Sequence, residues 1–234
     1  MVELVRRSFL KNVAGVTAAA TVAGCTQPVA LNMPSSKLVG GPDDLQSELT
    51  VYMYAPDNGG EAGNQGIPFM FRPMVGFVEQ GTTVTWTHAG NESVLHSSTA
   101  FGGTSSDPRL IPTDAKGWNS GPFAAKKDPY QHTFETPGVY VYYCMPHKNF
   151  GMAGIIVVGD VGPDDPGWSP GMTEPIRSDS PLSPEMTQKI PELRGMVEKQ
   201  YETTGQSEQQ QEIDQSNRKQ ETGQSNRQQE GGSS

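Results

Sequence analysis

The middle of this 234-residue chain alternates short runs of β-branched and aromatic residues with clusters of glycine and asparagine. Typical runs are Val51–Tyr54, Thr82–Thr87 and Val139–Cys144. Short runs separated by turn residues are typical of the strands of a β-sandwich or a small barrel, and they leave no room for a long helix. The sequence therefore predicts an all-β domain over residues 48–159. The stretch 101–129, rich in glycine, proline and aspartate, is predicted to be an irregular excursion on its surface.

Two of the strand-like runs enclose a loop that carries three kinds of metal-binding side chain. Cys144, His147 and Met152 lie on this one short loop, so all three can turn toward one point. His96 follows the run that ends near Thr87 and can approach from a neighbouring strand. Two imidazoles, one thiolate and a weak thioether ligand favour copper over zinc. A folded frame that holds copper in one geometry suits the transfer of single electrons.

The loop and its flanking strands resemble the cupredoxins, in particular their plastocyanin-like branch and most of all the halocyanins. The resemblance covers roughly residues 48–159. It rests on Cys-x-x-His-x-x-x-x-Met after Pro-Gly-x-Tyr-x-Tyr-Tyr, and on Gly-Thr-Thr-Val-Thr-Trp followed by Asn-Glu-Ser-Val-Leu-His. It implies a Greek-key β-sandwich and one copper ion that cycles between Cu(I) and Cu(II). It also implies a type 1 (blue) copper electron carrier rather than an enzyme.

The same resemblance assigns roles to individual residues. The implied copper ligands are His96, Cys144, His147 and Met152, and Tyr140 is implied to pin the corner before the last strands.

The chain departs from the family pattern beside two of these ligands. Many cupredoxins have Asn directly after the first His and Ser or Thr directly after the Cys, and these residues tie the two ligand strands together. Here the positions hold Ser97 and Met145, so the sequence does not predict the tie. Pro146 also has no N–H to offer to the sulfur of Cys144.

Other residues compete for metal-binding or redox roles. His88, at a strand end, is the alternative to His96, but the family pattern puts the ligand after the Asn-x-Ser-x-x segment, which implies a structural role for His88. His132 is predicted to lie on a sheet face. Scattered methionines more often fill a core than bind a second copper; here they are Met53, Met70 and Met74. A disulfide between Cys25 and Cys144 is the default for two cysteines in an exported chain, but the local context gives each cysteine a different task.

The N-terminal residues are predicted to be an export signal. Arg6-Arg7-Ser-Phe-Leu-Lys precedes a weakly apolar stretch that is too short to cross a bilayer, so residues 1–24 resemble a twin-arginine signal peptide. The sequence Val-Ala-Gly-Cys25 resembles a lipobox, which predicts a lipid on Cys25; cleavage near Ala23 is the alternative. Residues 25–47 are predicted to be a flexible tether, which places the domain at the outer face of the cell membrane.

Two segments follow the predicted β domain. Residues 160–201 are predicted to hold an extended stretch and then a short helix. Ser183-Pro184-Glu185 is typical of a helix start, and Met186, Ile190, Leu193 and Val197 form one apolar stripe. The stripe could pack on its own domain or bind a partner. Residues 202–234 are rich in Gln, Ser and Glu, which predicts a disordered tail.

The formal charge of −9 argues against nucleic acid as a partner, because phosphate binding needs clustered Lys and Arg. We expect a monomer that meets membrane-bound or soluble redox proteins near His147. The ring edge of His147 is expected to reach the surface within an apolar patch that includes Met145 and Phe150. Copper oxidases and nitrite reductases need further histidines, and only His88 and His132 remain. Copper chaperones more often use exposed ligands, which a buried Cys ligand argues against.

Overall fold

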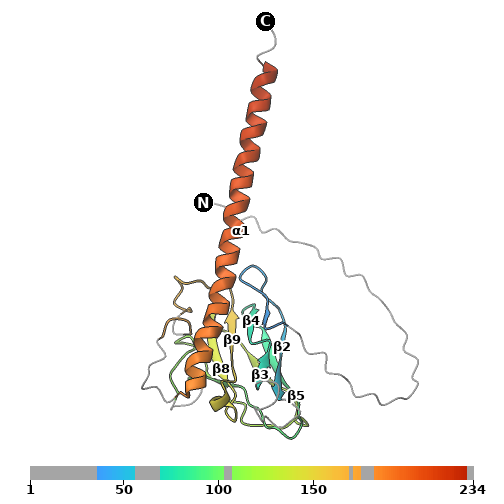
Figure 1. Ribbon diagram of the computed structural model, residues 1–234, viewed down its shortest axis with the longest axis vertical. Coiled ribbons are helices and arrows are strands. Elements are labelled where there is room, and N and C mark those ends of the chain that lie inside the picture. The colour runs from blue at the N-terminus through green and yellow to red at the C-terminus, as the bar shows by residue number, and fades with distance from the viewer. Residues whose placement is uncertain (1–35, 56–68, 103–106, 169–170, 175–181, 231–234) are drawn as a thin grey trace, which may run out of the picture. The chain divides into compact units, whose positions relative to one another are not determined.

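The computed structural model describes residues 36–55, 69–102, 107–168, 171–174 and 182–230 (Figure 1). The predicted signal peptide, Cys25 and the first part of the predicted tether lie outside these residues. The elements in chain order are β1 Leu38–Val39, β2 Leu49–Ala55, β3 Met70–Arg72, β4 Val75–Val78, β5 Thr83–Gly90, β6 Thr99–Ala100, β7 Tyr130–Thr133, β8 Gly138–Tyr143, η1 Lys148–Phe150, β9 Ala153–Val158 and α1 Pro184–Glu230. Within this part of the chain, no helix has both the length and the apolarity needed to cross a bilayer.

The strands form two mixed sheets. One sheet has the order β1-β4-β9-β8-β6 and the other has the order β3-β2-β5-β7. Neighbours in space are often distant in sequence: β2 runs parallel to β5, and β4 runs parallel to β9. This arrangement confirms the predicted all-β sandwich fold.

The core between the sheets follows from the alternation of side chains along each strand. In β2, Val51 and Met53 are fully buried while the residues between them are partly exposed. An aromatic cluster fills the centre, where Trp86 lies 5.5 Å from Tyr142 and 5.7 Å from Trp118 between ring centroids. Trp118 is contributed by the stretch 101–129, so that stretch is part of the core and the prediction of a surface excursion is wrong.

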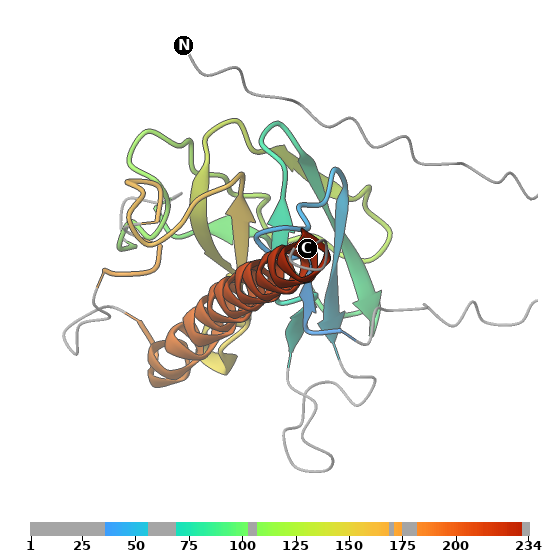
Figure 2. The ribbon, with the colours of Figure 1, turned by 90° about the horizontal axis from the view of Figure 1, so that it is seen from above.

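Strands β8 and β9 are buried on both faces. On the outer side of their sheet, α1 packs on β9 and β4 (Figures 1 and 2). The predicted helical stripe is fully buried there: Met186, Ile190, Leu193 and Val197. The helix therefore packs on its own domain. Trp168 and Met172, from the segment predicted to be extended, are buried in the same cluster.

The helix and the domain are both longer than predicted. The helix continues through the Gln-rich region to Glu230 instead of ending near residue 201. The packed first turns supply the costly nucleus, and Gln, Glu, Lys and Arg are good helix formers that extend it. At the other end, residues 38–47 are not a tether. Leu38 pairs beside Val75, and the N–H of Gln46 donates to the carbonyl of Phe77 at 2.9 Å. A two-residue strand is too short to show a period in sequence.

The burial of α1 predicts that it contributes to the stability of the whole domain. Replacing Leu193 by alanine should lower the free energy of unfolding by about 2–5 kcal/mol, because the side chain is fully buried. Urea denaturation of the metal-free chain measures the loss. The exposed Gln188 on the same helix gives a matched control, since its change to alanine should shift stability by less than about 0.5 kcal/mol. Equal effects of the two changes would contradict this packing.

Candidate metal centre

The four residues singled out in the sequence come from different parts of the sandwich. His96 lies in the segment between β5 and β6, and its backbone pairs with Phe123 through hydrogen bonds of 3.1 and 2.8 Å. Cys144 directly follows β8, His147 directly precedes η1, and Met152 directly precedes β9. The loop is closed at its ends, because the N–H of Cys144 donates to the carbonyl of Met152 at 3.0 Å.

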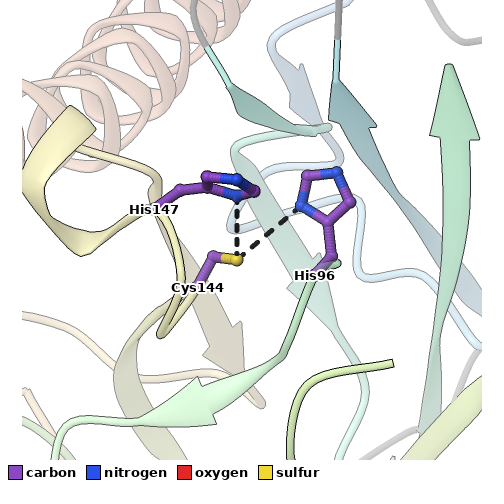
Figure 3. A group of neighbouring side chains, drawn as sticks. All are labelled: His96, Cys144 and His147. Atoms are coloured by element: carbon purple, nitrogen blue, oxygen red, sulfur yellow. Dashed lines mark hydrogen bonds between the residues drawn. The ribbon is translucent and has the colours of Figure 1, made fainter. Parts of the chain in front are cut away.

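Three of the four residues meet around the sulfur of Cys144 (Figure 3). Its Sγ atom lies 3.3 Å from Nδ1 of His147 and 3.7 Å from Nδ1 of His96. All three donor atoms lie within 4.8 Å of one another, and the three residues are buried. Metal–nitrogen bonds of about 2.0 Å and metal–sulfur bonds of about 2.3 Å fit between atoms at these separations. The residues therefore fit a small ion bound by one thiolate and two imidazoles.

Burial sets the charge of the metal-free site. It lowers the pKa of His96 to about 3, helped by the neighbouring His147 and His88, and it lowers the pKa of His147 to about 4. Burial also raises the pKa of the Cys144 thiol to about 11, against hydrogen bonds that favour the thiolate. Both rings are neutral at pH 7 and can offer Nδ1 to a metal. The thiol proton leaves when a metal binds.

Met152 is fully buried, and its N–H donates to the carbonyl of His147 at 3.3 Å. Its backbone is therefore fixed in the loop that carries two of the other three residues. A thioether is a soft donor of the kind that copper accepts.

Ser97 ties the strand of His96 to the loop of Cys144. Its N–H points at Sγ of Cys144 at 3.3 Å, and its hydroxyl accepts the N–H of Met145 at 2.7 Å. The sequence did not predict this tie, because the family pattern expects other residues at both positions. A serine hydroxyl bonded to a backbone N–H needs no particular side chain at Met145.

Aromatic rings cover His147, which is only 6% exposed. The Phe69 ring stacks on it with centroids 3.8 Å apart and planes at 6°. Phe150 contacts the edge of Phe69 with centroids 5.2 Å apart and is itself 51% exposed. His147 therefore keeps only a small exposed fraction, and that its ring edge reaches the surface stays a prediction. The exposed ring nearest to it is that of Phe150.

A buried ion pair holds the loop from its other side. Lys148 Nζ lies 2.7 Å from Oδ1 of Asp107, whose side chain is 3% exposed. The hydroxyl of Tyr143 donates to Oδ2 of the same carboxylate. Asp107 thus contacts the residue before Cys144 and the residue after His147. Sequence reasoning missed Asp107, because it lies in the irregular stretch and only the fold brings it to the loop.

The competing residues have structural roles. His88 Nε2 lies 2.7 Å from the carbonyl oxygen of Val94, and His132 in β7 stacks on Trp118 with centroids 4.7 Å apart. Met53 and Met74 are buried in the core. Tyr140 pins its corner as predicted, because its hydroxyl donates to the carbonyl of Thr136 at 2.5 Å.

A two-sheet sandwich whose loop carries one thiolate beside two imidazoles defines a copper-binding β-sandwich of the cupredoxin type. Residues 61–159 match the plastocyanin/azurin family of copper binding proteins. This part of the chain is therefore similar to that family, whose members bind one copper ion.

Three individual proteins are similar to parts of this chain. The halocyanin of Natronomonas pharaonis is 28% identical over 175 residues, which cover 68% of this chain and 99% of that protein. The pseudoazurin of Methylobacterium extorquens AM1 is 16% identical and has a TM-score of 0.44, covering 64% of this chain and 98% of that one. The oxidised plastocyanin of Dryopteris crassirhizoma is 22% identical, with a TM-score of 0.35 and coverage of 47% and 98%.

Proposed function

We propose that this chain is a type 1 copper protein that carries single electrons between redox partners. The copper ligands in this proposal are His96, Cys144, His147 and Met152. The observation that carries it is the position of the Cys144 sulfur, which faces Nδ1 of both histidines inside a buried loop. A copper ion held there supplies a one-electron couple between Cu(I) and Cu(II).

The backbone supports this function by keeping the loop in one conformation. The carbonyl of His147 accepts the N–H of both Phe150 and Met152, at 3.0 and 3.3 Å, and the carbonyl of Cys144 accepts the N–H of His147 at 3.2 Å. Together with the Ser97 contacts, these bonds leave the donors little freedom to move. A fixed site needs little rearrangement when its charge changes, which speeds electron transfer.

A carrier is favoured over an enzyme or a copper chaperone. Among the described residues, the group of His96, Cys144 and His147 is the one cluster of His, Cys, Asp or Glu suited to a metal. A reaction that needs a second copper would need a second cluster. The burial of all three residues argues against rapid exchange of the metal, which a chaperone requires.

The N-terminal pattern supports an extracytoplasmic place for the domain. In this part of the proposal, residues 1–24 direct export and Cys25 carries the lipid that holds a monomer at the outer face of the membrane. Mass spectrometry of the membrane fraction tests it, because the mature chain should begin at Cys25 with attached acyl groups. A mature chain without lipid would contradict it.

The absorption spectrum of the copper-loaded, oxidised protein tests the main proposal. We expect an intense visible band from charge transfer between thiolate and copper. A reductant that delivers one electron per chain should remove this band. Copper that binds without colour, or a band that no reductant bleaches, would contradict the proposal.

Phe150 is expected to be part of the docking surface. Leu95 and Met145 are also exposed apolar residues, and each is next in sequence to a proposed ligand. Replacing Phe150 by aspartate should slow electron self-exchange between two copies by about tenfold or more, because each encounter then juxtaposes two new like charges. NMR line broadening in mixtures of oxidised and reduced protein measures this rate. Gln80→Glu is the control. It adds the same charge just before the start of β5, whereas His96 follows the end of β5, so it should change the rate little. Bleaching of the copper by Phe150→Asp would show that Phe150 shapes the site instead.

A further inference from the structure

A groove of about 330 Å³ lies next to the proposed copper site. Phe69 and Phe150 form part of its wall, together with residues of β3, β9 and α1. Phe69 also stacks on His147, so one aromatic ring separates the groove from a proposed copper ligand. Any group bound in the groove therefore lies close to the proposed copper site, from which the electron would leave.

The charge of the groove is opposite to that of the protein. Its lining includes three cationic side chains, Lys37, Arg72 and Lys189, and one carboxylate, Glu192. Glu192 pairs with Lys189 at 2.8 Å, which leaves Lys37 and Arg72 without an ion-pair partner among the described residues. The whole chain carries a formal charge of −9, so this excess of positive charge is local.

Arg72 supplies the second observation. Its Nε atom contacts Sδ of Met70 at 3.0 Å, but its Nη1 atom is buried and has no hydrogen-bond partner in the described part of the chain. A buried donor on a charged group without a partner is costly. A guanidinium matches the two oxygens of a carboxylate, and the Arg72 side chain lines the groove, so a carboxylate bound there can pair with it.

We propose that this groove is the docking point for an acidic segment of the redox partner, whose carboxylate binds Arg72 while its neighbouring surface covers Phe150. The assignment rests on the electron-transfer function proposed above. The groove is large enough for a side chain but small for a cofactor, and its aromatic rings, methionines and arginine are residue types enriched at protein interfaces. The positive charges select an acidic partner, and Phe69 gives that partner a short route to His147.

Two small oxidants of opposite charge test the groove with the copper-loaded, reduced, full-length chain. Hexacyanoferrate(III) is an anion and tris(phenanthroline)cobalt(III) is a cation; each takes one electron from the copper and becomes Fe(II) or Co(II). Arg72→Gln and Lys37→Gln should each slow the anion about three- to tenfold at low ionic strength, and should leave the cation unchanged or slightly faster. Glu192→Gln should speed the anion, because it removes the one negative charge of the groove.

The control variant is Lys116→Gln, which removes an exposed positive charge outside the groove and should leave both rates unchanged. Lys37 is exposed, so its variant should fold even if Arg72→Gln does not. Hexaglutamate should compete with hexacyanoferrate for the native protein more strongly than acetate at the same carboxylate concentration. It should lose that advantage with Arg72→Gln or Lys37→Gln.

The outcomes distinguish failure of the groove proposal from failure of the electron-transfer function on which that proposal depends. Equal rates for Lys37→Gln, Arg72→Gln and Lys116→Gln with hexacyanoferrate would overturn the groove proposal and leave the carrier intact. Competition by acetate as strong as by hexaglutamate would show a site for small anions, which also overturns docking of a protein segment. A native protein that reacts with neither oxidant would overturn the carrier, and the role of the groove with it.

Discussion

Replacing Cys144 by serine is expected to abolish the visible colour of the copper-loaded protein and its one-electron reactivity. In the proposed site the thiolate is the donor in the charge-transfer band, and a hydroxyl is too hard and too weakly acidic to replace it. The buried thiol already has its pKa raised to about 11, so a serine at the same place would stay protonated. Absorption spectroscopy and stopped-flow oxidation of the loaded variant measure both losses.

The chain offers a matched control, because it has two cysteines. Cys25→Ser removes the other thiol and should keep the full colour, whereas a disulfide between the two cysteines would make both variants alter the site. The Cys144→Ser variant should fold, since serine is smaller and can accept the N–H of Ser97 that now points at the sulfur. Circular dichroism checks the fold. An oxidised copper complex of Cys144→Ser that keeps the intense band would remove the thiolate from the ligand set.

The fold could be predicted from sequence where the signal is local. Short runs of β-branched and aromatic residues predicted the strands that became β2, β5 and β8, because these side chains fit a pleated, half-buried surface. The apolar stripe of α1 was equally clear. Whether that stripe packs on its own domain could not be predicted from sequence. The answer depends on which apolar side chains lie together on the outer face of the sheet, and these come from distant parts of the chain.

The candidate site shows the same division between local and distant information. Cys144 and His147 share one short loop, so their spacing alone brings them together, and His96 was placed by family resemblance. The contacts that hold these residues come from elsewhere in the chain. Phe69 and Asp107 are far from the loop in sequence, and neither has a spacing that relates it to a ligand. Their roles follow from sheet pairing and from the course of the irregular stretch.

These supporting contacts make the site stiff in a way that the ligand motif alone does not imply. Ser97 holds the sulfur from the strand side, and the pair of Asp107 and Lys148 holds the loop from the other. Supporting contacts of this kind orient metal ligands and tune the metal. A change in one of them should therefore alter both stability and the copper spectrum.

Lys148→Met is expected to be more damaging than Asp107→Asn, although both variants break the same ion pair. The side chain of Asp107 is 3% exposed and that of Lys148 is 22% exposed. Without Lys148 the carboxylate stays buried beside Tyr143, and removing one partner of a buried ion pair costs about 3–5 kcal/mol. Without the Asp107 charge, the ammonium can move toward water on its flexible stem, and the loss should be about 1–2 kcal/mol.

A double-mutant cycle tests this asymmetry by urea denaturation of the metal-free variants. The double variant Asp107→Asn/Lys148→Met should be more stable than Lys148→Met alone, because the buried carboxylate is then gone. The visible spectrum of each copper-loaded variant gives a second readout. Lys148→Met should shift the charge-transfer band. Lys148 directly follows His147, and its partner Asp107 also contacts Tyr143, which directly precedes Cys144. If the two single variants lose equal stability and leave the band unchanged, the ion pair does not position the ligand loop. The restraint on Cys144 and His147 would then come from Ser97 and the backbone hydrogen bonds of the loop.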